Sequence, residues 1–179
     1  MLRVKNALVY WVIGAGVSWV FFRNLSWTGG VAYDDTALDA ATRTLLAEAS
    51  YARPKKEMIG VLQVGVNRSK KGVPLVDVFT PPGKPNWNGS RTFRERWNDA
   101  RGYPQWDKAR AFTKRVLDGE YPNPIGDRVQ FLHPRGMPRC NDGECPKGRV
   151  CVDTVAGKRC LPRWSLGANV KVIDGARFS

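Results

Sequence analysis

The feature that most constrains the fold is an apolar helical face that ends in a carboxylate. In the segment 35–50, Leu38, Ala41, Leu45 and Glu48 follow the spacing that stacks side chains on one side of a helix. That face is expected to turn toward the core, where Glu48 loses part of its hydration. Desolvation raises the pKa of a carboxyl group and keeps it protonated near neutral pH, so that it can donate a proton. Glu48 is therefore the predicted catalytic residue.

Two consecutive helices are predicted to form a hairpin with Glu48 near its elbow. The first helix begins at a capping residue within 34–36 and ends near Tyr51. Pro54 suits the first turn of the second helix, which carries an apolar stripe and closes at Gly72.

The rest of the chain predicts one more long helix and little sheet. Five prolines and glycines between residues 73 and 88 predict an extended loop, and the periodicity of 104–119 predicts a third helix. A short helical segment fits 92–100, and short strands fit 128–132 and 168–173. The expected fold class is mainly α (α+β).

The first thirty residues are predicted to form a membrane anchor and a linker. Residues 7–22 are an uncharged stretch of 16 residues with basic residues on both sides. As a helix this stretch covers about 24 Å, slightly less than the ~30 Å hydrocarbon core of a bilayer. A cleaved signal peptide is the alternative. The predicted division is an anchor over 1–30 and one domain over 31–179, which the charge pattern places outside the cytoplasm, in the periplasm or extracytoplasmic space.

The net charge of +13 indicates a polyanionic partner. Nucleic acid, an anionic membrane and the acidic polymers of a bacterial envelope are the three candidates. The 29 lysines and arginines are scattered and are not interleaved with aromatic residues in the pattern of a nucleic-acid module. The sequence therefore predicts no nucleic-acid partner.

The cysteines indicate an oxidising compartment. All four lie within 21 residues, in a Gly- and Asp-rich segment, which is typical of a small disulfide-stapled loop over 138–161. Zinc is the alternative, but the spacings lack a C-x2-C knuckle and His133 is an unconvincing ligand. Two disulfides and no metal are expected, with three possible connectivities among Cys140, Cys145, Cys151 and Cys160.

Several motifs carry a resemblance to a known family. The predicted hairpin holds Leu-Leu-Ala-Glu-Ala-Ser, which contains Glu48, and then Glu57-Met-Ile-Gly-Val-Leu-Gln-Val-Gly-Val-Asn67-Arg68. With these motifs the chain resembles the SleB-like cell wall hydrolases, named for the spore-cortex-lytic enzymes. Coverage runs from about Thr36 to Phe178, with the cysteine segment as an insertion. Further matching stretches are 76–87, 111–119, 131–134, 162–164 and 173–178.

The resemblance implies a lysozyme-like, goose-type or transglycosylase-like fold that cuts the bond between N-acetylmuramic acid and N-acetylglucosamine in peptidoglycan. Glu48 would be its general acid, and no cofactor is implied. A salt bridge to Arg68 is the structural alternative for Glu48. The remaining candidates are Asn67 and Arg68 as structural residues, Tyr51, Gln130 and His133 as cleft-lining residues, and Trp87 as a sugar-stacking residue.

Two points stay open in the sequence. Asp77 and Glu57 are the candidates for a second carboxylate; without one, the expected enzyme is a lytic transglycosylase rather than a muramidase. The segment 127–130 departs from the family pattern, which makes a non-catalytic envelope-binding or virion structural protein the alternative function. The source of an active enzyme would be a bacterium remodelling its wall, or a phage that uses it as an endolysin or virion lysin.

Overall fold

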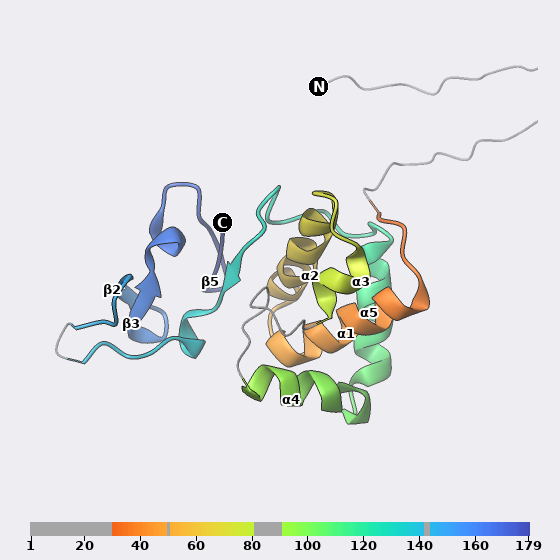
Figure 1. Ribbon diagram of the computed structural model, residues 1–179, viewed down its shortest axis with the longest axis horizontal. Helices are drawn as coiled ribbons and strands as arrows, with labels where there is room; N and C mark the ends of the chain where they lie inside the picture. Colours follow the sequence, from red (N-terminus) through yellow and green to blue (C-terminus); the bar gives the residue numbers. More distant parts are fainter. Residues whose placement is uncertain (1–29, 50, 81–90, 142–143) are drawn as a thin grey trace, which may run out of the picture.

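The computed structural model describes residues 30–49, 51–80, 91–141 and 144–179 (Figure 1). The helices are α1 (Asp35–Ala49), α2 (Lys55–Ser69), α3 (Leu75–Phe79), α4 (Arg91–Asp99) and α5 (Trp106–Leu117), with 3₁₀ turns η1 (Ala100–Gly102), η2 (Pro134–Gly136) and η3 (Arg163–Leu166). The strands are β1 (Phe131–Leu132), β2 (Arg149–Thr154), β3 (Gly157–Pro162), β4 (Lys171–Ile173) and β5 (Ala176–Phe178).

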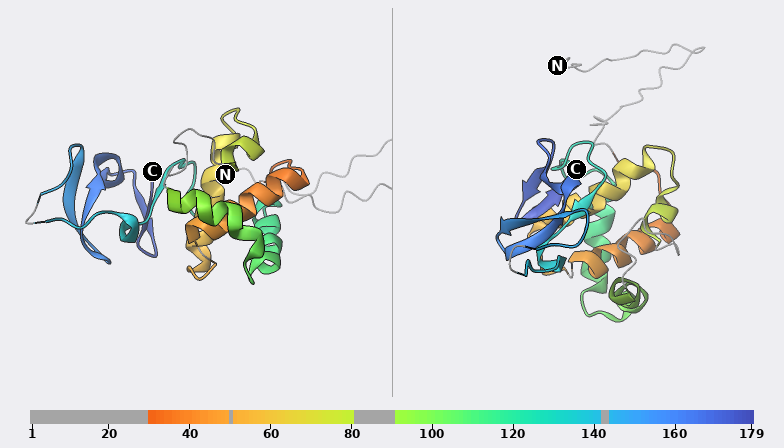
Figure 2. Two further views of the ribbon diagram at one scale, coloured as in Figure 1. Left: turned by 60° about the horizontal axis from the view of Figure 1, so that its bottom comes forward. Right: turned by 60° about the vertical axis from the view of Figure 1, so that its left-hand side comes forward.

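The chain folds into a helical half, residues 30–125, followed by a β half, residues 126–179. Figure 1 shows the helices gathered on one side and the strands on the other, and the left view of Figure 2 shows the same separation. Helices and strands are thus segregated along the chain, which is the arrangement of an α+β fold.

Helix α1 lies at the centre of the helical half. The Asp34 side chain caps it by accepting a hydrogen bond of 2.8 Å from the backbone N–H of Ala37. The apolar face expected from the sequence is buried, and α1 packs against α2, α3, α4 and α5. Inside this core the Thr44 hydroxyl donates to the backbone carbonyl of Phe79, so the buried polar group is satisfied.

Two glycines on α2 allow close approaches that the fold requires. A Cβ at Gly65 would overlap the ring of Phe79, which comes from the end of α3. A Cβ at Gly60 would lie 2.6 Å from Cζ of Phe178, which comes from β5. Gly65 therefore lets the end of α3 pack closely against α2, and Gly60 lets the last strand of the β half pack on α2.

The β half consists of two small antiparallel sheets. One has the strand order β1-β5-β4, and the other is the β2–β3 hairpin. Asp174 and Gly175 connect β4 to β5 with φ angles of 49° and 87°, as the two central positions of a type I′ turn require.

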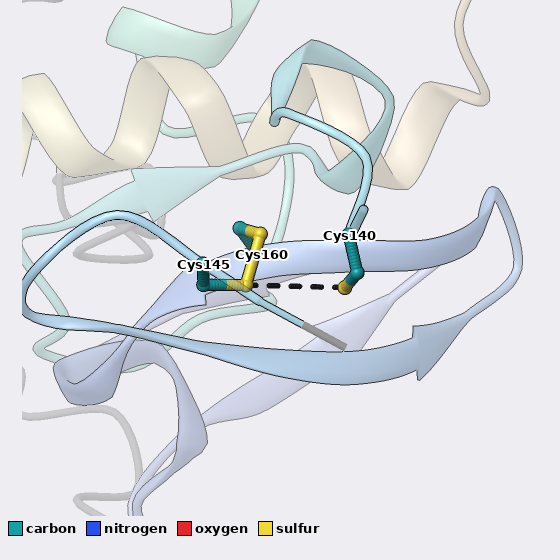
Figure 3. Close-up of side chains that lie close together, drawn as sticks. All are labelled: Cys140, Cys145 and Cys160. Carbon is teal, nitrogen blue, oxygen red and sulfur yellow. Dashed lines mark hydrogen bonds between the residues drawn. A yellow bond between two sulfur atoms is a disulfide. The ribbon is translucent and has the colours of Figure 1, made fainter. Parts of the chain in front are cut away.

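Two disulfides hold the β2–β3 hairpin to the loop that precedes it. The pairs are Cys140–Cys151 and Cys145–Cys160, and Cys151 and Cys160 face each other across the hairpin. Figure 3 shows the sulfur of Cys140 beside the Cys145–Cys160 bond, with 3.9 Å between Sγ of Cys140 and Sγ of Cys145. The prediction of two disulfides is confirmed, and no cysteine is left free.

The predicted fold class was wrong in two respects, the proportion of helix to strand and the membrane helix. Of the described residues 48% are helical and 17% lie in strands, so the fold is mixed α+β rather than mainly helical with little sheet. Within the described ranges, no helix has both the length and the apolar character needed to cross a bilayer. The predicted anchor over 7–22 has no support, and that segment lies outside the described residues.

The long helices follow the sequence periodicity, and the differences lie where the chain is irregular. Residues 75–79 form a turn of helix inside the stretch expected as a loop. The strand expected over 128–132 is reduced to residues 131–132, because Val129 and Gln130 instead donate their N–H groups to the carbonyl of Ser179.

Candidate active site

A cleft of about 650 Å³ lies where the helical half meets the β half. The two halves contribute about equally to its lining, so the cleft exists only when both are folded. From the helical half it is lined by Ala47, Glu48, Arg53, Arg68, Thr92, Phe93 and Arg96, and from the β half by Phe131, Leu132, His133, Gly136, Met137, Arg149, Pro162 and Trp164.

Glu48 lines this cleft from the last turn of α1. Its position on an otherwise buried helical face removes water from the carboxyl group, and this burial raises its pKa from 4.5 to about 7. The positive charge of Arg96 on α4 acts in the opposite direction and lowers the pKa. Glu48 is therefore a carboxylic acid that is substantially protonated at neutral pH and faces a cavity.

The structural alternative for Glu48 was a salt bridge to Arg68. Within the described residues Glu48 forms no salt bridge, although both side chains line the cleft. The Nε–H of Arg68 instead donates to the carbonyl of Val129 at 2.7 Å, and burial lowers the pKa of its guanidinium.

Asn67 and Arg68 hold the segment that leads from the helical half into the β half. The Asn67 amide donates to the carbonyls of Gly126 and Arg128 at 2.7 and 2.8 Å, next to the Arg68–Val129 bond. These three bonds satisfy backbone acceptors that belong to no regular element. The two residues therefore make the structural contacts expected of them, and they fix where the β half begins.

His133 lies in the cleft beside Arg53. Nη1 of Arg53 is 2.8 Å from Nε2 of His133 and 3.8 Å from Oε1 of Glu57. Desolvation, reinforced by the charges of Arg53 and Arg135, lowers the pKa of His133 to about 4. His133 is neutral at physiological pH, and in the tautomer with an unprotonated Nε2 it accepts a hydrogen bond from Arg53, so it orients the guanidinium instead of adding a charge.

Two predicted cleft residues lie elsewhere, and a third is not described. Tyr51 has a left-handed backbone with φ of 45°, and its ring packs edge-on against Phe112 at a centroid distance of 6.2 Å, away from the cleft. The Gln130 side chain accepts a hydrogen bond from the Ser179 hydroxyl at the chain terminus. Trp87 lies outside the described residues, so its predicted stacking role stays a prediction.

Neither candidate for a second carboxylate lines the cleft. Asp77 is exposed on α3, at a distance from the cleft lining. Glu57 is 1% exposed, has no hydrogen-bond partner among the described residues, and has its pKa raised by desolvation. Glu48 is the single carboxyl group among the described residues that line the cleft.

Sequence reasoning missed the side chains that give the cleft its charge and its outer wall. Arg53 comes from the loop before α2, Arg96 from α4, Arg149 from β2 and Trp164 from η3, and the four share no sequence motif. The only signal in the sequence was the large excess of basic residues, which does not say where they gather.

Comparison with models of protein families, with curated proteins and with solved structures finds no match to this chain. The chemistry of the cleft has to be inferred from its own residues. The protonated carboxyl group of Glu48 can donate a proton to a leaving oxygen. The guanidinium groups that line the same cleft can neutralise an anionic ligand.

Proposed function

We propose that this protein is a peptidoglycan-cleaving glycosidase of the lytic transglycosylase type, with Glu48 as its acid. The observation that carries the proposal is a carboxyl group with a pKa of about 7 that lines a cleft of about 650 Å³. General acids work best when their pKa lies near the operating pH, and ligand sites commonly have volumes of roughly 300–1,000 Å³. The resemblance of the Glu48 and Asn67-Arg68 motifs to cell wall hydrolases supports the choice of substrate.

The reaction needs one proton donor at the glycosidic oxygen. Glu48 donates its proton to that oxygen as the bond from C1 of the muramyl residue breaks, which leaves positive charge on C1 and negative charge on Glu48. The Glu48 carboxylate then takes the proton of the muramyl 6-hydroxyl as that oxygen attacks C1. The products are a 1,6-anhydromuramyl end and a free 4-hydroxyl, and Glu48 is protonated again.

The absence of a second carboxylate from the described lining favours this route over hydrolysis. Inverting and retaining hydrolases need a second acidic residue across the cleft, as a base or a nucleophile. The sequence adds weight, because outside the described ranges the only acidic residue is Asp142 in the cysteine segment. A single carboxyl group acting twice matches the transglycosylase reaction.

The two disulfides and the basic surface fit the place where such a substrate occurs. Disulfides persist in oxidising compartments such as the periplasm and the outside of the cell. A net charge of +13 attracts the protein to the anionic polymers of an envelope. We therefore place the activity outside the cytoplasm.

The proposal is tested by digesting purified sacculi with the full chain and identifying the released fragments by mass spectrometry. The wild type is expected to release fragments with 1,6-anhydro ends. Glu48→Gln keeps the shape of the side chain without the proton, so its rate should fall by about 10²–10⁴. Asp77→Asn is the matched control, because it removes a carboxylate outside the cleft, and it should keep the wild-type rate.

Each other outcome has a definite meaning. Reducing ends in place of anhydro ends would show a muramidase and overturn the transglycosylase assignment. Sedimentation of the wild type with sacculi without any released fragment would show a non-catalytic envelope-binding protein. Equal activity of the wild type and Glu48→Gln would exclude Glu48 as the acid.

A further inference from the structure

The cleft concentrates positive charge around the acid. Four arginines line it, Arg53, Arg68 and Arg96 from the helical half and Arg149 from the β half, and Glu48 is the one carboxyl group among the described lining residues. Glu48, with a pKa of about 7, balances these charges only in part near neutral pH, and the neutral His133 does not balance them. Glu57 lies 3.8 Å from Arg53 alone.

Several arginines outside the cleft pair with carboxylates of the protein. Asp39 binds both Arg43 and Arg101 at 2.7 Å, and Arg110 lies 2.9 Å from Asp35. In the cleft, Arg53 lies 3.8 Å from Oε1 of Glu57, whereas Arg149 forms no salt bridge among the described residues. A guanidinium that has no protein carboxylate in a partly enclosed cavity is stabilised when an anionic ligand supplies one.

Arg149 is the clearest case among the four. It is half-buried at the start of β2, and the one acceptor of its guanidinium within the described residues is the Sδ atom of Met137, at 3.6 Å. A thioether is a weak acceptor, so it leaves the planar fork of the guanidinium available for a carboxylate. Trp164, which is 40% exposed, lines the same cleft.

The disulfides fix the position of this wall. Arg149 faces Pro162 across the β2–β3 hairpin, two residues along the ladder from the Cys151 and Cys160 pair. Cys151 is bonded to Cys140 of the preceding loop. Cys160 is bonded to Cys145 of the same loop (Figure 3). Both strands are therefore fastened close to the point where Arg149 and Pro162 enter the cleft, and η3 carries Trp164 directly after β3.

We infer that Arg149 and Trp164 form a subsite for a saccharide that bears a carboxylate, with the guanidinium on the carboxylate and the indole against the sugar ring. This inference rests on the proposed function and names the part of the substrate that is recognised. In peptidoglycan the carboxylate has two possible sources. It is the free lactyl group of muramyl residues in strands without peptide, or a carboxylate of the stem peptide when the lactyl group is bound in an amide.

The test is a binding measurement with the full chain carrying Glu48→Gln, so that no cleavage interferes. Isothermal titration calorimetry compares four probes: peptide-free glycan strands, the same strands with the lactyl carboxyl converted to its methyl amide, strands with stem peptides attached, and neutral N-acetylglucosamine oligomers. Carboxylate-bearing strands should bind at least tenfold more tightly than both neutral probes. The tighter of the peptide-free and peptide-bearing strands identifies the source of the carboxylate.

Adding Arg149→Gln should remove most of that tenfold preference and leave binding of the neutral oligomers unchanged. Adding Trp164→Ala should weaken all four probes together, because every sugar ring has a face for stacking. Arg163→Gln is the matched control, since Arg163 is exposed beside Trp164 and does not line the cleft, and it should leave the preference unchanged.

Equal affinity for charged and neutral probes, no binding of any probe, or equal effects of Arg149→Gln and Arg163→Gln would overturn the inference. These results are separable from failure of the proposed function. Cleavage by the wild type without carboxylate preference would overturn the subsite alone, and carboxylate-dependent binding without cleavage would overturn the reaction alone.

Discussion

Each of the two halves of this molecule is stabilised in a different way. Most of the large, fully buried side chains lie in the helical half, and the β half contributes only Leu161 and Phe178 to them. Conversely, of the six large hydrophobic side chains that are exposed among the described residues, five lie in the β half: Val150, Val155, Trp164, Leu166 and Val172.

The difference shows how each half can serve the cleft. A packed core fixes side-chain positions closely, which suits the placing of an acid that must reach one oxygen atom. The β half has too little core for this, and two disulfides constrain it instead. The helical half thus supplies the group proposed to react, and the stapled half supplies the wall proposed to recognise the substrate.

Removing a disulfide should produce the largest difference in stability between the two halves. Replacing Cys145 and Cys160 together by serine opens a link with a sequence separation of 15. The β half should lose about 3 kcal/mol of stability, from the entropy of an open loop of that length. Hydrogen exchange should quicken in β2 and β3, while α1 and α2 keep their protection. Equal loss of protection in both halves would show that they form one cooperative unit.

Adding a methyl group at either close approach in α2 tests the packing there. One approach lies inside the helical half and the other at its junction with β5. Gly65→Ala forces Cβ into the ring of Phe79, and Gly60→Ala brings it to 2.6 Å from Phe178. Each should cost about 1–3 kcal/mol in chemical denaturation, as overpacking of a core does. Gly102→Ala meets nothing within 4 Å and should be neutral. A neutral Gly60→Ala would contradict tight packing of β5 on α2.

The raised pKa of Glu48, which lies in the helical half, predicts that the stability of the protein depends on pH. The folded-state pKa of about 7 exceeds the value of 4.5 for a free glutamate, so folding favours the protonated form. Its contribution to stability is complete below pH 4.5 and is lost as the pH rises through 7. Glu48→Gln should therefore match the wild type at pH 4 and exceed its stability at pH 8 by about 1–2 kcal/mol, allowing for partial exposure of the carboxyl group.

Thermal melts at the two pH values measure this difference directly. A variant with the same advantage at both pH values would show a packing effect instead of proton linkage. A variant with no advantage at pH 8 would show that Glu48 is not desolvated.

The smallest expected effect concerns the charge of α4 beside the acid. Arg96 lowers the pKa of Glu48, so Arg96→Gln should raise it. The high-pH limb of the activity profile should move upward by about half a pH unit, equivalent to ~0.7 kcal/mol, because solvent around the exposed Arg96 screens its charge. Arg94→Gln changes the charge of the same helix outside the cleft lining and should leave the limb in place. Equal shifts in both variants would indicate a general effect of net charge.

Sequence reasoning placed Glu48 on a buried helical face correctly because helical periodicity is local. The spacing of Leu38, Ala41 and Leu45 places Glu48 on the buried face of α1, and the Asp34 cap marks where this helix begins. The disulfides were predictable for a similar reason, since four cysteines within 21 residues have few other partners. Their connectivity was not, because it depends on which residues face each other across β2 and β3.

The lining of the cleft depended on contacts between distant residues, which no local pattern encodes. Tyr51 follows the helix that bears Glu48, yet its left-handed backbone lets the ring pack on Phe112. Gln130 is drawn to the chain terminus by its bonds with Ser179. Arg149 reaches the cleft from the start of β2, a placement that the sequence of an apparent insertion does not show.

The central claim is that burial keeps Glu48 protonated and makes it the acid of the reaction. The most direct test is the pH dependence of kcat/KM for cleavage of soluble glycan strands by the full chain. We predict a high-pH limb with its midpoint at about pH 7, falling tenfold per pH unit, and no such limb in the residual activity of Glu48→Gln. A midpoint near 4.5, the value of a free glutamate, or a limb that persists unchanged in Glu48→Gln, would contradict the claim.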